Sequence, residues 1–316
     1  WSNKDRNSTY DKMGTEQLIA RLGSWSPVVR ERAAKALGRR EDKVISQLID
    51  LLDAPDLHTR YGACQAIKMQ RERGAVAVPA LRDTFRSEDL WLRILAAEAL
   101  AGIGKPAKAA VPEMLMRLTK SDPQNDPRNM EQRYLCFALF NRRGGLIGKS
   151  LEGVDRELLI EAVRAGLRNE DGRARGSLGT VYEKLTYEEI KPLLPAVHQA
   201  IMEPAPSGIM FASAIRLKGV ELLARHRIRE GMPLCLQIME IHKWGKKNRI
   251  SRCLKALETY GAAAKAGLPQ LRQLEKDLLA HKEARMLEPM VEKTRALIKE
   301  IENANGTVEL RGMNDL

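Results

Sequence analysis

The sequence has few aromatic residues, few cysteines and no long apolar run. Aromatic residues make up only 4% of its 316 residues, so aliphatic side chains, chiefly alanine and leucine, must fill the core. None of the four cysteines belongs to a CxxC pair, which argues against a disulfide scaffold and predicts buried free thiols at Cys64, Cys136, Cys235 and Cys253. No apolar run approaches the ~18 residues that a membrane helix needs, and no signal peptide is recognisable. Because the chain begins at Trp1 rather than at methionine, we expect a fragment or a processed product.

The sequence also lacks a recognisable catalytic or metal-binding constellation. The five histidines show no metal-ligand spacing with one another or with cysteine. The segment 144–150 is similar to a phosphate-binding loop, but Arg143 stands where that motif requires its first glycine. The residues before it also form a helical pattern rather than a strand, so a linker is the better interpretation. We therefore predict a chain that is not an enzyme and needs no metal or cofactor.

Basic residues outnumber acidic ones, 53 to 41, and the formal net charge is +12. Such an excess bears on acidic partners such as nucleic acid, and does not by itself indicate a fold. With 30% of all residues charged, a solvated surface is the simpler explanation of a modest excess.

One pattern recurs along the chain. A polar capping residue is followed four positions later by an arginine, and then by small or apolar residues three, four, six and seven positions beyond that arginine. Offsets of three, four and seven lie on one helical face, and alanine at these positions allows close packing of neighbouring helices. The anchor positions are 30 to 42 residues apart, as in a two-helix repeat, at Arg30, Arg60, Arg93, Arg133, Arg175, Arg216 and Ile250.

A second pattern identifies the other helix of each pair. An apolar residue is followed by proline and then by further apolar residues, and proline is well tolerated in the first turn of a helix. The prolines in this pattern are Pro79, Pro112, Pro195, Pro233 and Pro269.

Together these two patterns resemble the HEAT-repeat family, particularly its short bacterial variant, over nearly the whole chain from Thr15 to Asn303. The second half also resembles terminal HEAT-like regions of large multidomain bacterial proteins of unknown function. The resemblance implies an all-α, right-handed superhelical solenoid of about eight helix pairs. It also implies that the anchor arginines join neighbouring repeats through acidic residues near the helix caps, here Asp56 and Asp89.

The expected organisation has three parts. Residues 1–14 form an N-terminal extension, residues 15–304 form the solenoid with a bend near the glycine-rich segment 142–153, and residues 305–316 form a flexible tail.

The leading functional hypothesis is a non-catalytic interaction module that presents a concave surface to another protein or to the rest of a larger polypeptide. The alternative is binding of nucleic acid or another polyanion by basic residues of the second helices and their loops. A DNA-glycosylase-like enzyme of the same family ranks third, because the tryptophans are scattered rather than gathered around one cleft. The candidate surface residues are Arg32, Arg39, Arg142, Lys184, Arg225, Lys243, Trp244, Lys246, Lys247, Arg249 and Arg252.

Overall fold

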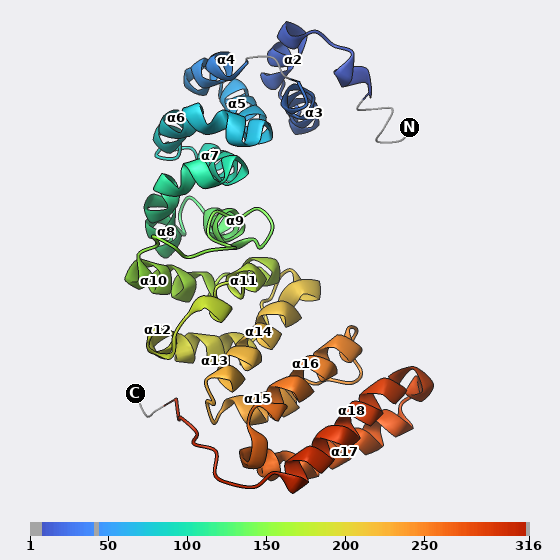
Figure 1. The fold of residues 1–316 in the computed structure, drawn as a ribbon. Coiled ribbons are helices and arrows are strands. Elements are labelled where there is room, and N and C mark those ends of the chain that lie inside the picture. Colours follow the sequence, from blue (N-terminus) through green and yellow to red (C-terminus); the bar gives the residue numbers. More distant parts are fainter. Residues whose placement is uncertain (1–7, 41–43, 314–316) are drawn as a thin grey trace. The chain divides into compact units, whose positions relative to one another are not determined.

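The computed structural model describes residues 8–40 and 44–313, and the chain forms two compact units. The regular structure in this part of the chain is helical and the fold is an all-α solenoid of stacked helix pairs, as predicted (Figure 1). Unit 1 ends with Asn169 and unit 2 begins with Glu170.

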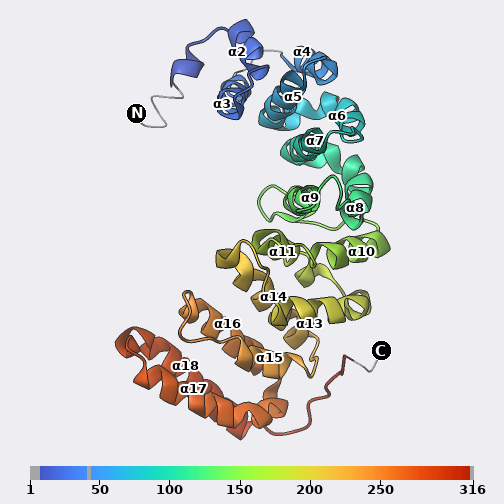
Figure 2. The ribbon, with the colours of Figure 1, turned by 180° about the vertical axis from the view of Figure 1, so that it is seen from behind.

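Unit 1 alternates first and second helices of successive pairs. The first helices are α2 (Thr15–Leu22), α4 (Ile45–Asp50), α6 (Val78–Thr84), α8 (Val111–Thr119) and α10 (Arg156–Gly166). The second helices are α3 (Pro27–Gly38), α5 (Leu57–Gln70), α7 (Leu90–Ile103) and α9 (Met130–Phe140), and each contacts the next (Figure 2). Short 3-10 helices occur at Leu51–Asp53 (η1), Arg71–Ala77 (η2) and Lys105–Ala110 (η3).

Unit 2 shows the same alternation and begins with a second helix. Its second helices, which again contact in chain order, are α11 (Gly172–Leu178), α14 (Ala212–Arg225), α16 (Lys246–Glu258) and α18 (Ala284–Asn303). The first helices are α12 (Tyr187–Ile190) with α13 (Leu194–Met202), then α15 (Gly231–Gln237) and α17 (Leu268–Ala280). The 3-10 helices here are η4 (Tyr182–Lys184), η5 (Lys191–Leu193), η6 (Ile209–Phe211) and η7 (Gly261–Gly267).

The small residues of the repeat are buried where the second helices meet. Ala63, Ala96 and Ala97 have no exposed surface, and the four cysteines are free and buried, as predicted. Gly38 of α3 shows how close this packing is, because a Cβ atom there would lie 2.5 Å from the Met69 Cβ of α5. Gly62 of α5 packs as closely on the end of α2, where a Cβ atom would lie 2.2 Å from the Leu22 carbonyl oxygen. The second sequence pattern also holds, since Pro79, Pro112, Pro195 and Pro269 occupy the second position of their helices and Pro233 the third.

The anchor arginines follow the expectation drawn from the family resemblance only in part, because Arg216 pairs with Glu240 of the next repeat at 3.1 Å but Asp56 and Asp89 are not the partners. Arg60 and Arg216 donate to backbone carbonyls at the turn between the two helices of their own pair: Arg60 Nε lies 2.8 Å from the Leu52 oxygen and Arg216 Nε 2.7 Å from the Ile201 oxygen. Asp56 and Asp89 instead accept hydrogen bonds from the first-turn amides of their own helices. The guanidinium group is needed inside its own turn, because those carbonyls would otherwise be unpaired.

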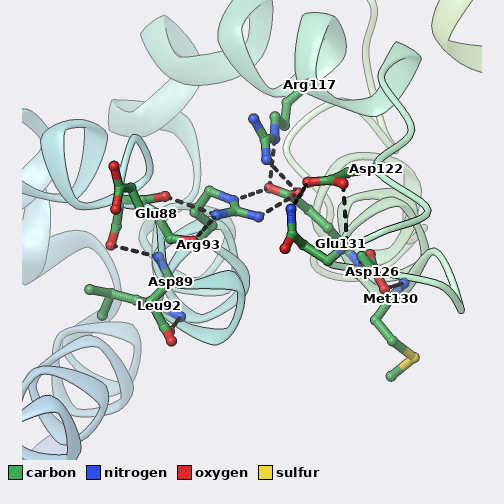
Figure 3. A network of polar contacts seen from close by, with 11 residues as sticks. Glu88, Asp89, Leu92, Arg93, Arg117, Asp122, Asp126, Met130 and Glu131 are labelled. Atoms are coloured by element: carbon green, nitrogen blue, oxygen red, sulfur yellow. Dashed lines mark hydrogen bonds and ion pairs between the residues drawn. The ribbon is translucent and has the colours of Figure 1, made fainter.

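Arg93 does join two repeats, through a residue that the sequence pattern did not single out. Its guanidinium contacts Glu131 at the start of α9, and Arg117 of α8 contacts the same carboxylate (Figure 3). Asp126 accepts hydrogen bonds from the amides of Met130 and Glu131 in the same turn, which holds the carboxylate-bearing helix end in place.

The division into units does not coincide with the glycine-rich segment. The division into units falls at residues 169 and 170, whereas the segment 142–153 is packed inside unit 1. Its Leu146 and Ile147 amides donate to the α9 carbonyls of Ala138 and Leu139, both at 3.0 Å. These hydrogen bonds pair carbonyl groups in the last turn of α9, so the glycine-rich segment caps the carboxyl end of this helix.

Both predicted terminal segments contact the repeats where the structure describes them. Asp11 forms an ion pair with Arg39, whereas residues 1–7 of the extension lie outside the described residues. In the predicted tail, Arg311 pairs with the turn after α14: its amide donates to Arg227 and its carbonyl accepts from Arg229, at 3.0 and 2.8 Å. Arg311 therefore fixes this segment against unit 2, and residues 314–316 lie outside the described residues.

Candidate binding surfaces

The candidate residues named from the sequence are divided between the two units. Arg32, Arg39 and Arg142 lie in unit 1, and the others lie in unit 2. In unit 1, Arg32 is half-buried in α3, Arg39 pairs with Asp11, and Arg142 is exposed in the turn after α9.

Arg249 has to be removed from the predicted surface. Its side chain is only 4% exposed, and its guanidinium donates to the carbonyl oxygens of Met239 and Glu240 at 3.2 and 2.7 Å. Arg249 thus performs the turn-holding role of the anchor arginines, one position before the expected anchor Ile250. Because Arg249 stands one residue away from the expected anchor position, the sequence pattern assigned this structural arginine to the surface.

Most of the other basic candidates in unit 2 already have partners. Arg252 of α16 contacts both carboxylate oxygens of Glu221 on α14, at 2.5 and 2.7 Å. Lys246 pairs with Glu283, and Lys243 pairs with Glu240. The remaining two donate to backbone carbonyls, Lys184 to that of Thr180 and Arg225 to that of Tyr182. Lys247 and Trp244 are exposed, and Trp244 retains 90% of its accessible surface.

Large apolar side chains are exposed at the beginnings of the second helices. All three tryptophans that the structure describes lie there: Trp25 before α3, Trp91 in the first turn of α7 and Trp244 before α16, with 80, 44 and 90% exposure. Leu57 begins α5, and Met210 and Met286 occur at the corresponding places of α14 and α18, with 37, 75 and 60% exposure. We call Trp25, Leu57 and Trp91 the apolar edge of unit 1.

The helix beginnings that carry the apolar edge lie side by side because α3, α5 and α7 pack in parallel. The Tyr61 hydroxyl near the start of α5 donates to Asp89 at the start of α7, at 2.9 Å. Towards the other ends of these helices, Lys68 pairs with Glu98 at 2.9 Å. The helix beginnings therefore lie next to one another, and the Trp91 ring is held edge-on against Tyr134, with 6.1 Å between ring centroids.

The opposite ends of the second helices in unit 1 border a basic groove with a volume of about 1550 Å³. Its acidic lining residues are Glu72 and Glu98. Its nine basic lining residues are Lys35, Arg39, Lys68, Arg71, Arg73, Lys105, Lys108, Arg143 and Lys149. Of the residues predicted to bind a polyanion, Arg39 alone lines this groove.

The sequence contains a signal for the groove that single helices do not reveal. A pair of basic residues follows each second helix of unit 1, as Arg39 with Arg40, Arg71 with Arg73, Lys105 with Lys108, and Arg142 with Arg143. These pairs stand in the turns that connect successive repeats, and stacking the repeats brings the turns together.

The buried thiols are inert rather than activated. Burial raises the pKa of the Cys64 and Cys253 thiols to about 12, so both remain protonated at neutral pH. The described residues contain no group of three or more His, Cys, Asp or Glu side chains able to hold a metal ion. None of the helices in this part of the chain is both long enough and apolar enough to span a membrane.

The stacked helix pairs, the turn-holding arginines and the small residues between second helices define an all-α solenoid. Residues 15–101 match the family model of HEAT repeats, so this part of the chain consists of HEAT repeats. HEAT repeats are generally protein-interaction modules and are typically non-enzymatic. No match was found among curated proteins.

Proposed function

We propose that the chain is a non-catalytic interaction module and that the apolar edge of unit 1 binds an extended segment of a partner protein. The observation that carries this proposal is the position of the tryptophans. Trp25 and Trp91 are large apolar side chains exposed near the beginnings of second helices in different repeats. Tryptophan is among the residues most enriched at the positions that dominate protein-binding energy.

The charge around the apolar edge suggests the composition of the partner. Asp53, Asp56 and Glu88 lie in the turns beside it. An extended segment with apolar side chains separated by lysine or arginine would complement both features. Asp56 is suited to this role because hydrogen bonds from the Thr59 hydroxyl and amide lower the pKa of its carboxyl, which keeps it ionised.

Selection from a random peptide library displayed on phage tests the proposal. The full chain should enrich peptides that combine aromatic or aliphatic residues with basic ones. Trp25→Ala with Trp91→Ala should abolish their binding, whereas Met116→Ala should not. Met116 is a matched control because it is 47% exposed, close to the 44% of Trp91, and lies elsewhere on unit 1. Failure to enrich peptides, or peptides that bind the double variant equally well, would refute the proposal.

A further inference from the structure

We infer that the basic groove of unit 1 is a second binding site, which takes the phosphate backbone of a nucleic acid. This inference does not depend on the apolar edge, because the groove lies at the opposite ends of the same helices.

Not every cation of the groove is available to a ligand. Lys35 and Lys68 pair with Glu31 and Glu98, and Arg39 pairs with Asp11. Arg73 donates to the carbonyl oxygens of Gly38 and Arg40, at 2.8 and 2.6 Å, and so joins two neighbouring turns. Among the described residues, no hydrogen-bonding or ion-pair partner is found for the side chains of Arg71, Lys105, Lys108, Arg143 and Lys149.

These five side chains, which we call the open cations, carry a concentrated positive charge that no protein group within the described residues pairs with directly. They stand in three successive turns, after α5, after α7 and after α9, so the charge extends along the stack. A polymer with a regularly repeated negative charge fits this arrangement, because each cation that contacts a phosphate releases condensed counterions.

Complementing the helix dipole does not account for all of the open cations. A cation near the carboxyl end of a helix stabilises it, but the effect falls off within the last turn. Lys35 and Lys68 occupy last turns and fit that explanation. Lys108 lies in the 3-10 helix beyond α7, and Lys149 lies well past Phe140, the last residue of α9.

The lining of the groove favours nucleic acid over an acidic protein segment. Lysine is depleted in protein–protein interfaces, which are anchored by aromatic and apolar side chains. Three of the five open cations are lysines, and none of the large apolar side chains found exposed in the described residues lines the groove. Interfaces with nucleic acid are more polar and much more positively charged.

The glycine-rich segment contributes to this site through side chains and not through amides. Its Gly145, Leu146 and Ile147 amides already donate to the carbonyls of Asn141, Ala138 and Leu139. It therefore does not form a phosphate loop, although it places Arg143, Lys149 and Ser150 on the wall of the groove.

The test is titration of the full chain with fluorescently labelled duplex DNA, and with single-stranded DNA and RNA of matching sequence, over a range of salt concentrations. The test variant combines Lys105→Gln, Lys108→Gln and Lys149→Gln. The control variant combines Lys120→Gln and Arg128→Gln, two exposed residues of the loop between α8 and α9. Unlabelled poly-glutamate serves as the competing polyanion.

The unmodified chain should bind at least one of these nucleic acids, with affinity falling steeply as salt rises. In the test variant the slope of log affinity against log salt should become shallower by about 0.9 for each duplex phosphate that the protein no longer neutralises, and the control variant should leave the slope unchanged. No binding at low salt would overturn the inference, as would equal weakening by both variants. Equal affinity for poly-glutamate would overturn it too and assign the groove to an acidic protein. The double variant Trp25→Ala, Trp91→Ala should bind nucleic acid normally. This result distinguishes a failure of the groove inference from a failure of the proposed function.

Discussion

Arg93 of α7 and Glu131 of α9 form a buried ion pair between neighbouring repeats, with 2.7 Å between Nε and Oε1 and 3.1 Å between Nη2 and Oε2. The two side chains are 7% and 10% exposed. The Arg93 guanidinium also donates to the carbonyls of Ser87 and Glu88, and Arg117 contacts the same carboxylate (Figure 3). Because these charges are paired with one another, removing Glu131 leaves the buried guanidinium of Arg93 without a carboxylate to balance its charge.

Glu131→Ala should therefore destabilise the chain strongly. Breaking one partner of a buried ion pair costs about 3–5 kcal/mol because the remaining charge stays desolvated. Urea unfolding measures the loss. Glu31→Ala, which removes the partner of exposed Lys35, should change the unfolding free energy by at most about 1 kcal/mol. Similar losses in both variants would mean that the Arg93–Glu131 pair is not effectively buried.

Gly62→Ala should destabilise the contact between the first two repeats. The added Cβ would meet the Leu22 carbonyl oxygen at 2.2 Å, and backbone atoms have to shift to admit it. We expect a loss of about 1–3 kcal/mol, typical of overpacking. Gly144→Ala is the matched control, since nothing lies within 4 Å of a Cβ atom there. Thermal unfolding of the two variants should differ clearly, and equal midpoints would contradict the helix register.

Arg249→Ala should destabilise unit 2, whereas Lys247→Ala should not. The Arg249 guanidinium donates to the carbonyls of Met239, Glu240 and Trp244, which would lose these partners. Leaving buried acceptors unpaired costs about 1–3 kcal/mol, and an exposed substitution such as Lys247→Ala stays within about 0.5 kcal/mol. Chemical denaturation followed by circular dichroism distinguishes them. A neutral Arg249→Ala would return this residue to the candidate ligand surface.

His226 should make stability depend on pH in mildly acidic solution. Burial, then the neighbouring charges of Arg225 and Arg311, lower the pKa of its imidazole below the ordinary 6.5. The folded state therefore disfavours the proton that the unfolded chain accepts. This contribution to stability is complete above pH 6.5 and is lost as pH falls towards the lower folded pKa.

The measurement is the unfolding free energy of the unmodified chain and of His226→Gln over this pH range. The difference between the two should change with pH, with the unmodified chain losing more stability on acidification. An unchanged difference across the range would show that His226 does not titrate in the way its surroundings indicate.

A feature of this protein could be predicted from the sequence when the residues that determine it lie close together along the chain. Helix starts, caps and buried small residues depend on neighbours a few positions away, so their spacing predicted the second helices around Arg60 and Arg93 and the buried thiol of Cys64. The carbonyl partner of Arg60 was not predicted, because an acceptor such as the Leu52 carbonyl carries no side-chain signal. Arg249 was misplaced because it stands one position before the expected anchor Ile250.

The sequence by itself determines the repeating helix pairs, because periodic apolar positions and capping residues act locally. The availability of each charge, in contrast, depends on tertiary packing. Arg252 and Glu221 are 31 positions apart and meet because α14 packs on α16. Stacking of the same kind gathers the inter-repeat turns of unit 1 into a basic groove and places Trp25 and Trp91 along one edge. Such surfaces arise from the register between repeats, which is set by close packing at positions such as Gly62 and is not encoded in any single repeat.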